Sequence, residues 1–367
     1  MLTFFLFRSV FKWIFRIILA FVSLSLLWVV AYRFLNPPTT LLIQSRASEY
    51  GTAAKQEWVD YDQISDNMKL AVICGEDQRF KDHMGFDFKA IEKAIEHNIE
   101  VIKQGVALGS EALSVWLADG SCFPGQLNFR NAFNNTLESL QEIYAALPDH
   151  WKVFVEYKAF EPNFYSMSVG DWGQSYLYVS KLGSKASTLV DLGHHLPNAN
   201  IEQIVALLLM EEKLAGFHFN DSKYGDDDLT AGALKPYQLF LIFNELVEGM
   251  DARGMNHAKD LGWMIDASHN VKDPMEDLLQ SVEAIMVAYA QALSVDRKAL
   301  EIAQEENDVV KAQEILQNAF RTDVRALVAE ARLRSGAALN PVGLYRDLAV
   351  RNGLIAERGL KTVATGL

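Results

Sequence analysis

Acidic, basic and imidazole side chains end several apolar runs between residues 110 and 270, and these groups could do chemistry. Glu156 and Lys158 stand two apart in WKVFVEYKAF, so on a strand both point to the same face. The runs STLVDLGHH, LAGFHFNDS and LGWMIDASHN and the loop YGDDD supply the remaining candidates, which are Asp191, His194, His218, Asp226, Asp228 and Asp266. Carboxylates and imidazoles that converge on one mouth are the ligands that hard or borderline divalent cations require. The set is large enough for two ions.

Each of these groups also has a plain structural interpretation. Asp226 and Asp228 could belong to a solvated acidic loop, His218 could be a core histidine, and Glu156 with Lys158 could form a surface ion pair. A shared site is favoured because all of them end β-like runs on the same side of the predicted sheet. Four further histidines add no ligand spacing and are expected to be structural or solvent-facing: His150, His195, His257 and His269.

The elements that must position these groups follow from the pattern after about residue 97. Short apolar runs such as EALSVWLADG and ASTLVDLGHH alternate with amphipathic stretches such as FRNAFNNTLESLQEIYAAL. This alternation predicts an α/β fold with a parallel sheet. Polar residues at the carboxyl end of each strand favour a partial (β/α)8 TIM barrel with about five of its eight strands over residues 97–272. A long helical extension is expected over residues 273–367.

The N-terminal segment, residues 1–38, predicts a transmembrane helix. No charge occurs from Ile17 to Tyr32, whereas Arg8, Lys12 and Arg16 precede this stretch and Arg33 follows it. About 20 helical residues cover a hydrocarbon core of about 30 Å. A cleavable signal peptide is the alternative, but no small-x-small cleavage site follows. The positive-inside rule then predicts a single-pass protein of the bacterial inner membrane with its C-terminal part in the periplasm.

Composition excludes some partners. The formal net charge is -13 and the sequence pI is near 5.1, with no basic stripe, which argues against a nucleic-acid partner. The two cysteines, Cys74 and Cys122, fit neither a disulfide framework nor a C-x-x-C metal site.

Residues 39–96 contain a second group of candidate residues. The stretch LAVICGEDQRFKDHMGF places Glu76, Asp77, Phe80, His83 and Gly85 in the order E-D-x-x-F-x-x-H-x-G. This pattern resembles the opening motif of the monofunctional peptidoglycan glycosyltransferases. The resemblance implies that Glu76 is the general base that activates the acceptor hydroxyl, although an idle acid at a helix start is the alternative.

That resemblance covers only about the first quarter of the chain. The family continues with a Gly-Gly-Ser-Thr-Ile-Ser-Gln-Gln type segment and a second carboxylate, whereas this chain continues IEVIKQGVALGSEALS. A seam is therefore expected near residues 95–98.

From about residue 96 to the C-terminus the chain resembles bacterial L-rhamnose isomerase of the broad-specificity type. The stretches VWLADGSCFPGQ, DLGHHLPNANIE and GFHFNDSKYGDDDL carry this resemblance. It implies two metal ions, usually manganese. One ion would be held by Glu156, Asp191, His218 and Asp266, and the second by His194, Asp226 and Asp228.

The same resemblance implies the reaction and the sugar contacts. The reaction would interconvert an aldose and a ketose, L-rhamnose and L-rhamnulose or a related pair, by metal-assisted hydrogen transfer between C1 and C2 of the open-chain sugar. Lys158 would contact the sugar oxygen at C1 or C2, and Trp116 would line the sugar pocket. Lys158 and Asp226 are the residues expected to take part in catalysis.

The chain departs from the isomerase pattern at its start. Only about five of the eight barrel strands can be counted, and the missing ones are the first three. Weak or absent turnover is therefore predicted, because the loss of three strands leaves two unpaired sheet edges and an uncovered core. The isomerase family is cytoplasmic, whereas the anchor directs this chain outward. The chain thus looks like a fusion of two gene fragments, and a natural fusion, an assembly error, an artificial fusion and a non-catalytic product all stay open. The preferred aldose and the oligomeric state, a homo-oligomer included, also stay open.

Overall fold

The computed structural model describes residues 88–117, 128–159, 167–252, 261–267, 272–347 and 350–358, together with scattered positions between residues 12 and 65. The chain divides into two compact units, Met1–Asp87 and Phe88–Leu367. Several predictions concern positions outside the described residues, namely those for Cys74, Glu76, Cys122, His257 and His269.

The second unit contains a half-barrel of five parallel strands. These are β1 (Ala112–Trp116), β2 (Lys152–Glu156), β3 (Ala186–Asp191), β4 (Leu214–Phe219) and β5 (Gly262–Ile265). The strands lie in the sheet in their sequence order, and every neighbouring pair is parallel. The expectation of an α/β sheet with about five barrel strands is confirmed.

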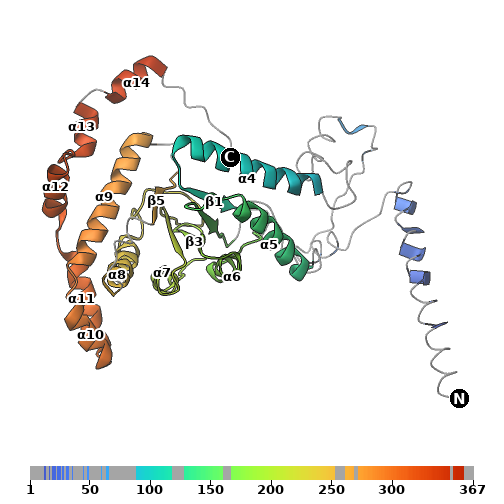
Figure 1. The fold of residues 1–367 in the computed structure, drawn as a ribbon, viewed down its shortest axis with the longest axis horizontal. Helices are drawn as coiled ribbons and strands as arrows, with labels where there is room; N and C mark the ends of the chain where they lie inside the picture. The colour runs from blue at the N-terminus through green and yellow to red at the C-terminus, as the bar shows by residue number, and fades with distance from the viewer. Residues whose placement is uncertain are drawn as a thin grey trace. The chain divides into compact units, whose positions relative to one another are not determined.

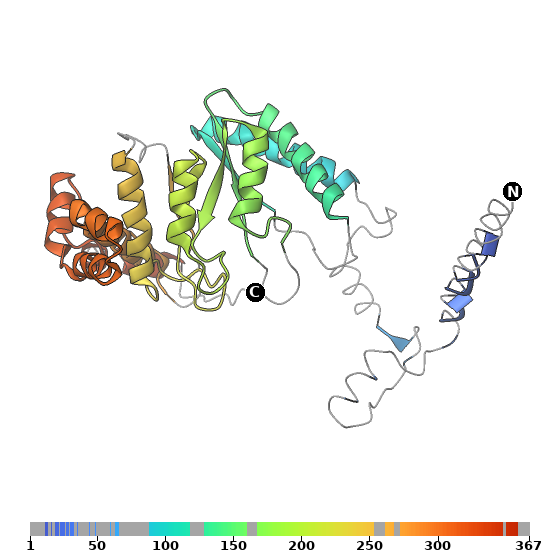
Figure 2. The same cartoon turned by 90° about the horizontal axis from the view of Figure 1, so that it is seen from below.

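Helices cover the outer face of this sheet. In Figure 1 the helices α5 to α9 form an arc around the strands, and Figure 2 shows the later helices gathered on the side of this unit opposite α4. Their bounds are α4 (Phe88–Leu108), α5 (Phe129–Ala145), α6 (Trp172–Leu182), α7 (Ile201–Met210), α8 (Pro236–Ala252), α9 (Pro274–Leu293), α10 (Arg297–Glu305), α11 (Val309–Arg321), α12 (Arg325–Arg334), α13 (Pro341–Asp347) and α14 (Val350–Arg358). The expected helical extension after residue 273 is thus present as α9 to α14.

Alternation along the strands decides which side chains face the site. In β2, Val153 and Val155 belong to the large core under the helices, whereas Phe154 packs with Leu189 of β3 and Ala215 of β4 in a small cluster on the inner face. The period of two in a strand therefore places the next inner-facing position of β2 at Glu156.

Helix α4 runs without a break through the seam expected near residues 95–98. Ile102 of this helix is buried in the core of the second unit, and Ile95 and Val101 pack against it. The boundary between the two compact units falls at the start of α4. The apolar spacing typical of a helix is thus maintained from one side of the seam to the other.

Within the described part of the chain, no single helix is both long and apolar enough to cross a bilayer, although α9 and α10 meet that criterion together as a pair bent by 66°. Leu19–Tyr32 forms a shorter apolar helix that includes positions outside the described residues. The predicted anchor stays a prediction.

Candidate metal centre

The predicted ligands lie at the carboxyl ends of four neighbouring strands. Glu156 ends β2, Asp191 ends β3, His218 is the penultimate residue of β4, and Asp266 directly follows β5. Asp191 and His218 are register partners across the β3–β4 ladder. Parallel strands bring their carboxyl ends to one edge, so residues from distant parts of the sequence meet there.

The His218 ring lies among three carboxylates. Its Nδ1 is 3.1 Å from Oε1 of Glu156, 3.4 Å from Oδ2 of Asp191 and 3.4 Å from Oδ2 of Asp266. Ligands held about 2.1 Å from one ion lie about 3.0 to 3.4 Å apart in octahedral or tetrahedral coordination. Asp191, His218 and Asp266 therefore have the spacing of a cation site.

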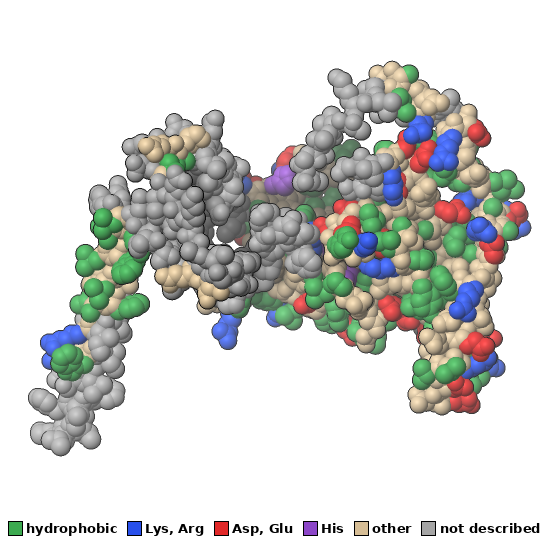
Figure 3. Space-filling view, turned by 180° about the vertical axis from the view of Figure 1, so that it is seen from behind, with side chains coloured by type: hydrophobic (Ala, Val, Ile, Leu, Met, Phe, Trp, Pro, Cys, Tyr) green, Lys and Arg blue, Asp and Glu red, His purple; other side chains and the backbone are tan. Residues whose placement is uncertain are grey.

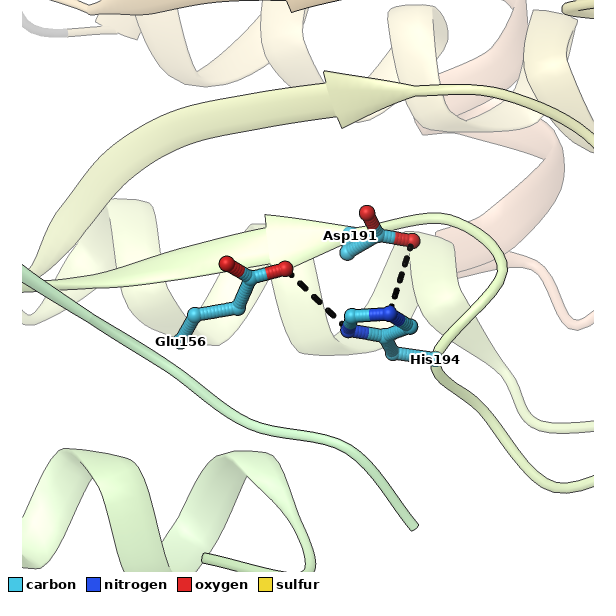
Figure 4. A group of neighbouring side chains, drawn as sticks. All are labelled: Glu156, Asp191 and His194. Atoms are coloured by element: carbon cyan, nitrogen blue, oxygen red, sulfur yellow. Dashed lines mark ion pairs between the residues drawn. The ribbon is translucent and has the colours of Figure 1, made fainter. Parts of the chain in front are cut away.

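His194, in the turn after β3, joins a second group with Glu156 and Asp191 (Figure 4). Its Nδ1 is 3.1 Å from both Oε1 of Glu156 and the backbone carbonyl oxygen of Tyr157. Its Nε2 is 2.9 Å from Oδ1 of Asp226 and 4.0 Å from Oδ1 of Asp191. The contacts of Nδ1 fix the orientation of the ring and direct Nε2 toward the carboxylates of Asp226 and Asp191. Histidine ligands commonly have one ring nitrogen held by a neighbouring group in this way.

The acidic loop after β4 is held in a strained shape. Asp226 and Asp228 both have positive φ, 57° and 47°, which is uncommon outside glycine. The carboxylate of Asp227, between them, accepts hydrogen bonds from the backbone N–H groups of residues 223, 224 and 225 at 2.8, 2.9 and 3.0 Å. Asp227 thereby fixes the loop and turns Asp226 toward His194.

The structure groups the candidate ligands differently from the assignment to two ions that the sequence predicted. Glu156, expected to share a group with His218, contacts His194 and His218 equally, and Asp191 belongs to both groups. Asp226 and Asp228, expected to ligate with His194, are in neither group of closely spaced ligand atoms found among the described residues, although Asp226 contacts His194.

Lys158 and Trp116 lie beside these ligands. Lys158 is buried, with 2% of its surface exposed, and its ammonium forms an ion pair with Asp226. Nζ of Lys158 lies 5.1 Å from the centre of the Trp116 ring, which also stacks on His194 with 6.2 Å between ring centres. Trp116 remains 42% exposed, so an aromatic surface faces solvent next to the charged groups.

Charge pairing shifts the ionisation of the inner groups strongly. Burial opposes the charged form of Glu156, yet hydrogen bonds from His194 and His218 lower the pKa of Glu156 to about 2. Burial likewise opposes the charged form of both imidazoles, but Asp226 and Glu156 raise the pKa of His194, and Asp191 and Glu156 raise that of His218, each to about 10.

The outer acids show the opposite shift. Burial, followed by the charges of Asp226, Asp266 and Asp191, raises the pKa of Asp228 to about 7. Burial and the neighbouring carboxylates also raise the pKa of Asp266. In addition, Oδ2 of Asp191 is buried and accepts no hydrogen bond among the described residues. Excess negative charge and a buried acceptor oxygen fit a divalent cation bound by oxygen and nitrogen ligands.

Sequence reasoning missed two supporting residues. Asn220 donates from Nδ2 to Oδ1 of Asp191 at 3.0 Å, and Asp227 shapes the acidic loop. His195, expected to be structural or solvent-facing, contacts the hydroxyl of Tyr157 through Nε2 at 2.6 Å. Burial lowers the pKa of His195 to about 4. Asn220 directly follows β4, so its place at a strand end was the signal available for it. His150 lies exposed.

Two curated relatives match the C-terminal part of the chain. A probable sugar isomerase of Rhizobium meliloti (strain 1021) is 56% identical over 266 residues, which cover 72% of this chain and 61% of that protein. Another of Mesorhizobium japonicum is 52% identical over 276 residues, covering 75% of this chain and 63% of that protein. The chain thus spans about three-fifths of the length of these relatives.

The N-terminal part matches a different family. A model described as transglycosylase matches residues 44–117. A biosynthetic peptidoglycan transglycosylase of Pseudomonas fluorescens (strain SBW25) is 42% identical over 96 residues, which cover 25% of this chain and 40% of that protein. The expectation that the two parts resemble two separate families is confirmed at the level of probable sugar isomerases and transglycosylases.

Two solved structures align with part of the chain at low sequence identity. A D-tagatose 3-epimerase-like protein has a TM-score of 0.42 and 19% identity, covering 61% of this chain and 74% of its own. An L-ribulose 3-epimerase has a TM-score of 0.38 and 16% identity, covering 62% of this chain and 73% of its own.

Proposed function

We propose that residues from about 97 onward form the metal-binding part of an aldose–ketose isomerase that acts on L-rhamnose or a related aldose. The observation that carries this proposal is Nδ1 of His218, which lies 3.1 to 3.4 Å from carboxylate oxygens that come from three different strands. The relationship to probable sugar isomerases supports the substrate class.

The proposed centre takes two divalent cations, manganese being the candidate ion. Asp191, His218 and Asp266 with Glu156 would hold one, and His194 with Asp226 and Asp228 would hold the other. When bound, such cations polarise the oxygens of a sugar as Lewis acids. The role of the protein is to keep carboxylates and imidazoles oriented in a buried place, where charge interactions are stronger than in water.

Lys158 and Trp116 would receive the sugar. The ammonium of Lys158 is held by Asp226 and lies over the Trp116 ring, so it can donate to a sugar oxygen at a fixed position. The exposed part of Trp116 offers an apolar surface to the carbon edge of the sugar.

Turnover by this chain is proposed to be weak or absent. Within the described residues, β1 and β5 each have a strand on one side only. Their inner-facing side chains Trp116 and Asp266 are exposed. An open sheet leaves the site accessible to water and its pocket walls incomplete. Robust conversion of L-rhamnose to L-rhamnulose by the purified chain with manganese would contradict this part of the proposal.

Sugar binding can be tested separately from turnover. Electron paramagnetic resonance of the purified full-length chain with Mn²⁺ should show a protein-bound signal that changes when L-rhamnose is added. Lys158→Met should keep the metal signal and lose the response to sugar, whereas Lys298→Met, a change on helix α10, should behave as wild type. A bound manganese signal that is indifferent to every aldose would overturn the isomerase assignment.

We propose a second candidate function for the N-terminal part, because residues 44–117 match the transglycosylase model. In this proposal residues 1–38 anchor the chain in the bacterial inner membrane, the rest is periplasmic, and Glu76 acts as a general base in glycan polymerisation. Membranes that contain the chain would be incubated with lipid-linked disaccharide. Polymer that forms with the wild type and not with Glu76→Gln supports this candidate, and equal absence of polymer in both rejects it.

A further inference from the structure

Asn220 is not one of the predicted metal ligands, but its side chain is hydrogen-bonded to Asp191, the most buried carboxylate among them. It follows β4 directly, and only 2% of its surface is exposed. Its Nδ2 donates to Oδ1 of Asp191 at 3.0 Å, and the backbone N–H of Gly193 donates to the same oxygen at 2.8 Å. Asp191 itself is fully buried.

These two donors act on one oxygen only. A carboxylate bound at Oδ1 by donors from two different segments cannot rotate without breaking hydrogen bonds in a buried place, which is costly. The other oxygen, Oδ2, accepts no hydrogen bond among the described residues and lies 3.4 Å from Nδ1 of His218. Oδ2 of Asp191 is thus available to the group of ligand atoms that also contains His218 and Asp266.

We propose that Asn220 is a positioning residue that fixes Asp191, so that this single carboxylate serves both groups of closely spaced ligand atoms, the one with Glu156 and His194 and the one with His218 and Asp266. The inference rests on the proposed metal centre and adds a residue to it. Asp191 is the one residue common to both groups of ligand atoms found in the described chain. Its orientation therefore decides whether both groups can be formed at once.

The chemistry of the amide fits this role. Asn220 supplies a neutral donor at a place where Asp226, Asp228 and Asp266 already gather negative charge. Its Oδ1 accepts no hydrogen bond among the described residues, so the side chain's bond to Asp191 is what orients the amide there. An aspartate in its place would add a like charge and remove the donor.

Gly193 allows the amide and the carboxylate to approach each other. A Cβ at this position would lie 3.0 Å from Oδ1 of Asn220 and 3.4 Å from Oδ1 of Asp191. A methyl group there would press on the side-chain amide of Asn220 and touch Oδ1 of Asp191. Gly193→Ala is therefore an independent way to disturb the amide while the residue at position 220 stays an asparagine.

The test is a set of Mn²⁺ titrations of the full-length chain by calorimetry, with thermal unfolding of each metal-free protein as the measure of folding. Asn220→Ala and Asn220→Asp should weaken Mn²⁺ binding by about 10- to 100-fold, the usual effect of removing a residue that orients a ligand. Gly193→Ala should weaken it in the same direction.

Asn244→Ala is the matched control. Asn244 is also buried, with 3% of its surface exposed, but its Oδ1 accepts from Nη1 of Arg297 at 2.7 Å, in helix α10. This variant should lower the unfolding temperature and keep the wild-type Mn²⁺ affinity.

The outcomes separate the two proposals. If the wild type binds Mn²⁺ and a folded Asn220→Ala or Gly193→Ala variant binds it equally well, the positioning role is wrong and the metal centre stands. If Asn244→Ala weakens binding as much as Asn220→Ala, the effect is one of general stability and the inference also fails. If the wild type itself binds no Mn²⁺, the proposed function fails first.

Discussion

At the scale of single residues, the positive charges of His194 and His218 balance the negative charges of the carboxylates around them. Each imidazole contacts Glu156, and the pKa of each is raised to about 10 by carboxylates. Without a metal ion both rings are therefore protonated near neutral pH and pair with the acids around them. A cation that binds through these nitrogens must displace their protons.

Mn²⁺ binding is accordingly predicted to release protons and to strengthen as pH rises. Protonated imidazoles compete with the ion below their folded pKa of about 10, so affinity should increase from about pH 6 to about pH 8. Asp228, with a pKa of about 7, adds to this dependence in the same direction. Calorimetry at one pH in buffers of different ionisation enthalpy would measure the protons released, and equal binding enthalpies in all buffers would contradict the prediction.

The sequence predicted which residues gather but not how they pair. Glu156, Asp191, His218 and Asp266 were identifiable because each ends an apolar run, and parallel strands bring such ends together. The contacts of Glu156 with both histidines depend on side-chain orientations that tertiary packing decides. Asn220 was missed because an asparagine directly after a strand is common in ordinary turns, so the residue type alone did not indicate a contact with Asp191.

At the scale of elements, the close approach of β4 and β5 positions Asp266 beside His218. Gly216 in β4 has a φ of +142°, and a Cβ there would lie 2.2 Å from the backbone oxygen of Gly262 in β5. A glycine inside a strand commonly marks a place where another backbone approaches closely. Its partner strand could be identified only from the fold.

Gly216→Ala is predicted to destabilise the half-barrel by about 2 kcal/mol or more, since the backbone conformation and the β4–β5 contact both exclude a side chain. The unfolding temperature should fall by several degrees. Gly353→Ala is the control, because Gly353 is exposed in helix α14 with no atom within 4 Å of its added Cβ. That change should raise stability by up to about 1 kcal/mol. Equal unfolding temperatures for the two variants would contradict this view of the strand pair.

For the whole molecule, the order of elements after about residue 97 was predictable from the sequence. Five apolar runs became five parallel strands, and the pattern after residue 273 became helices. Helix α4 continues through the positions of the expected seam, because helical periodicity is present on both sides of them and no stop signal interrupts it. Periodicity records local structure and does not record which family a segment came from.

In the proposed centre, Asp191 and its neighbours act together in binding metal ions. The direct measurement is a calorimetric titration of Mn²⁺ into the purified full-length chain and its Asp191→Asn variant. Asp308→Asn serves as control, since Asp308 caps helix α11 by accepting from the N–H of Lys311 at 3.0 Å. The wild type and Asp308→Asn should bind two ions saturably, and Asp191→Asn should lose at least about 10-fold in affinity. Undiminished binding by Asp191→Asn, or no saturable binding by the wild type, would contradict the central claim.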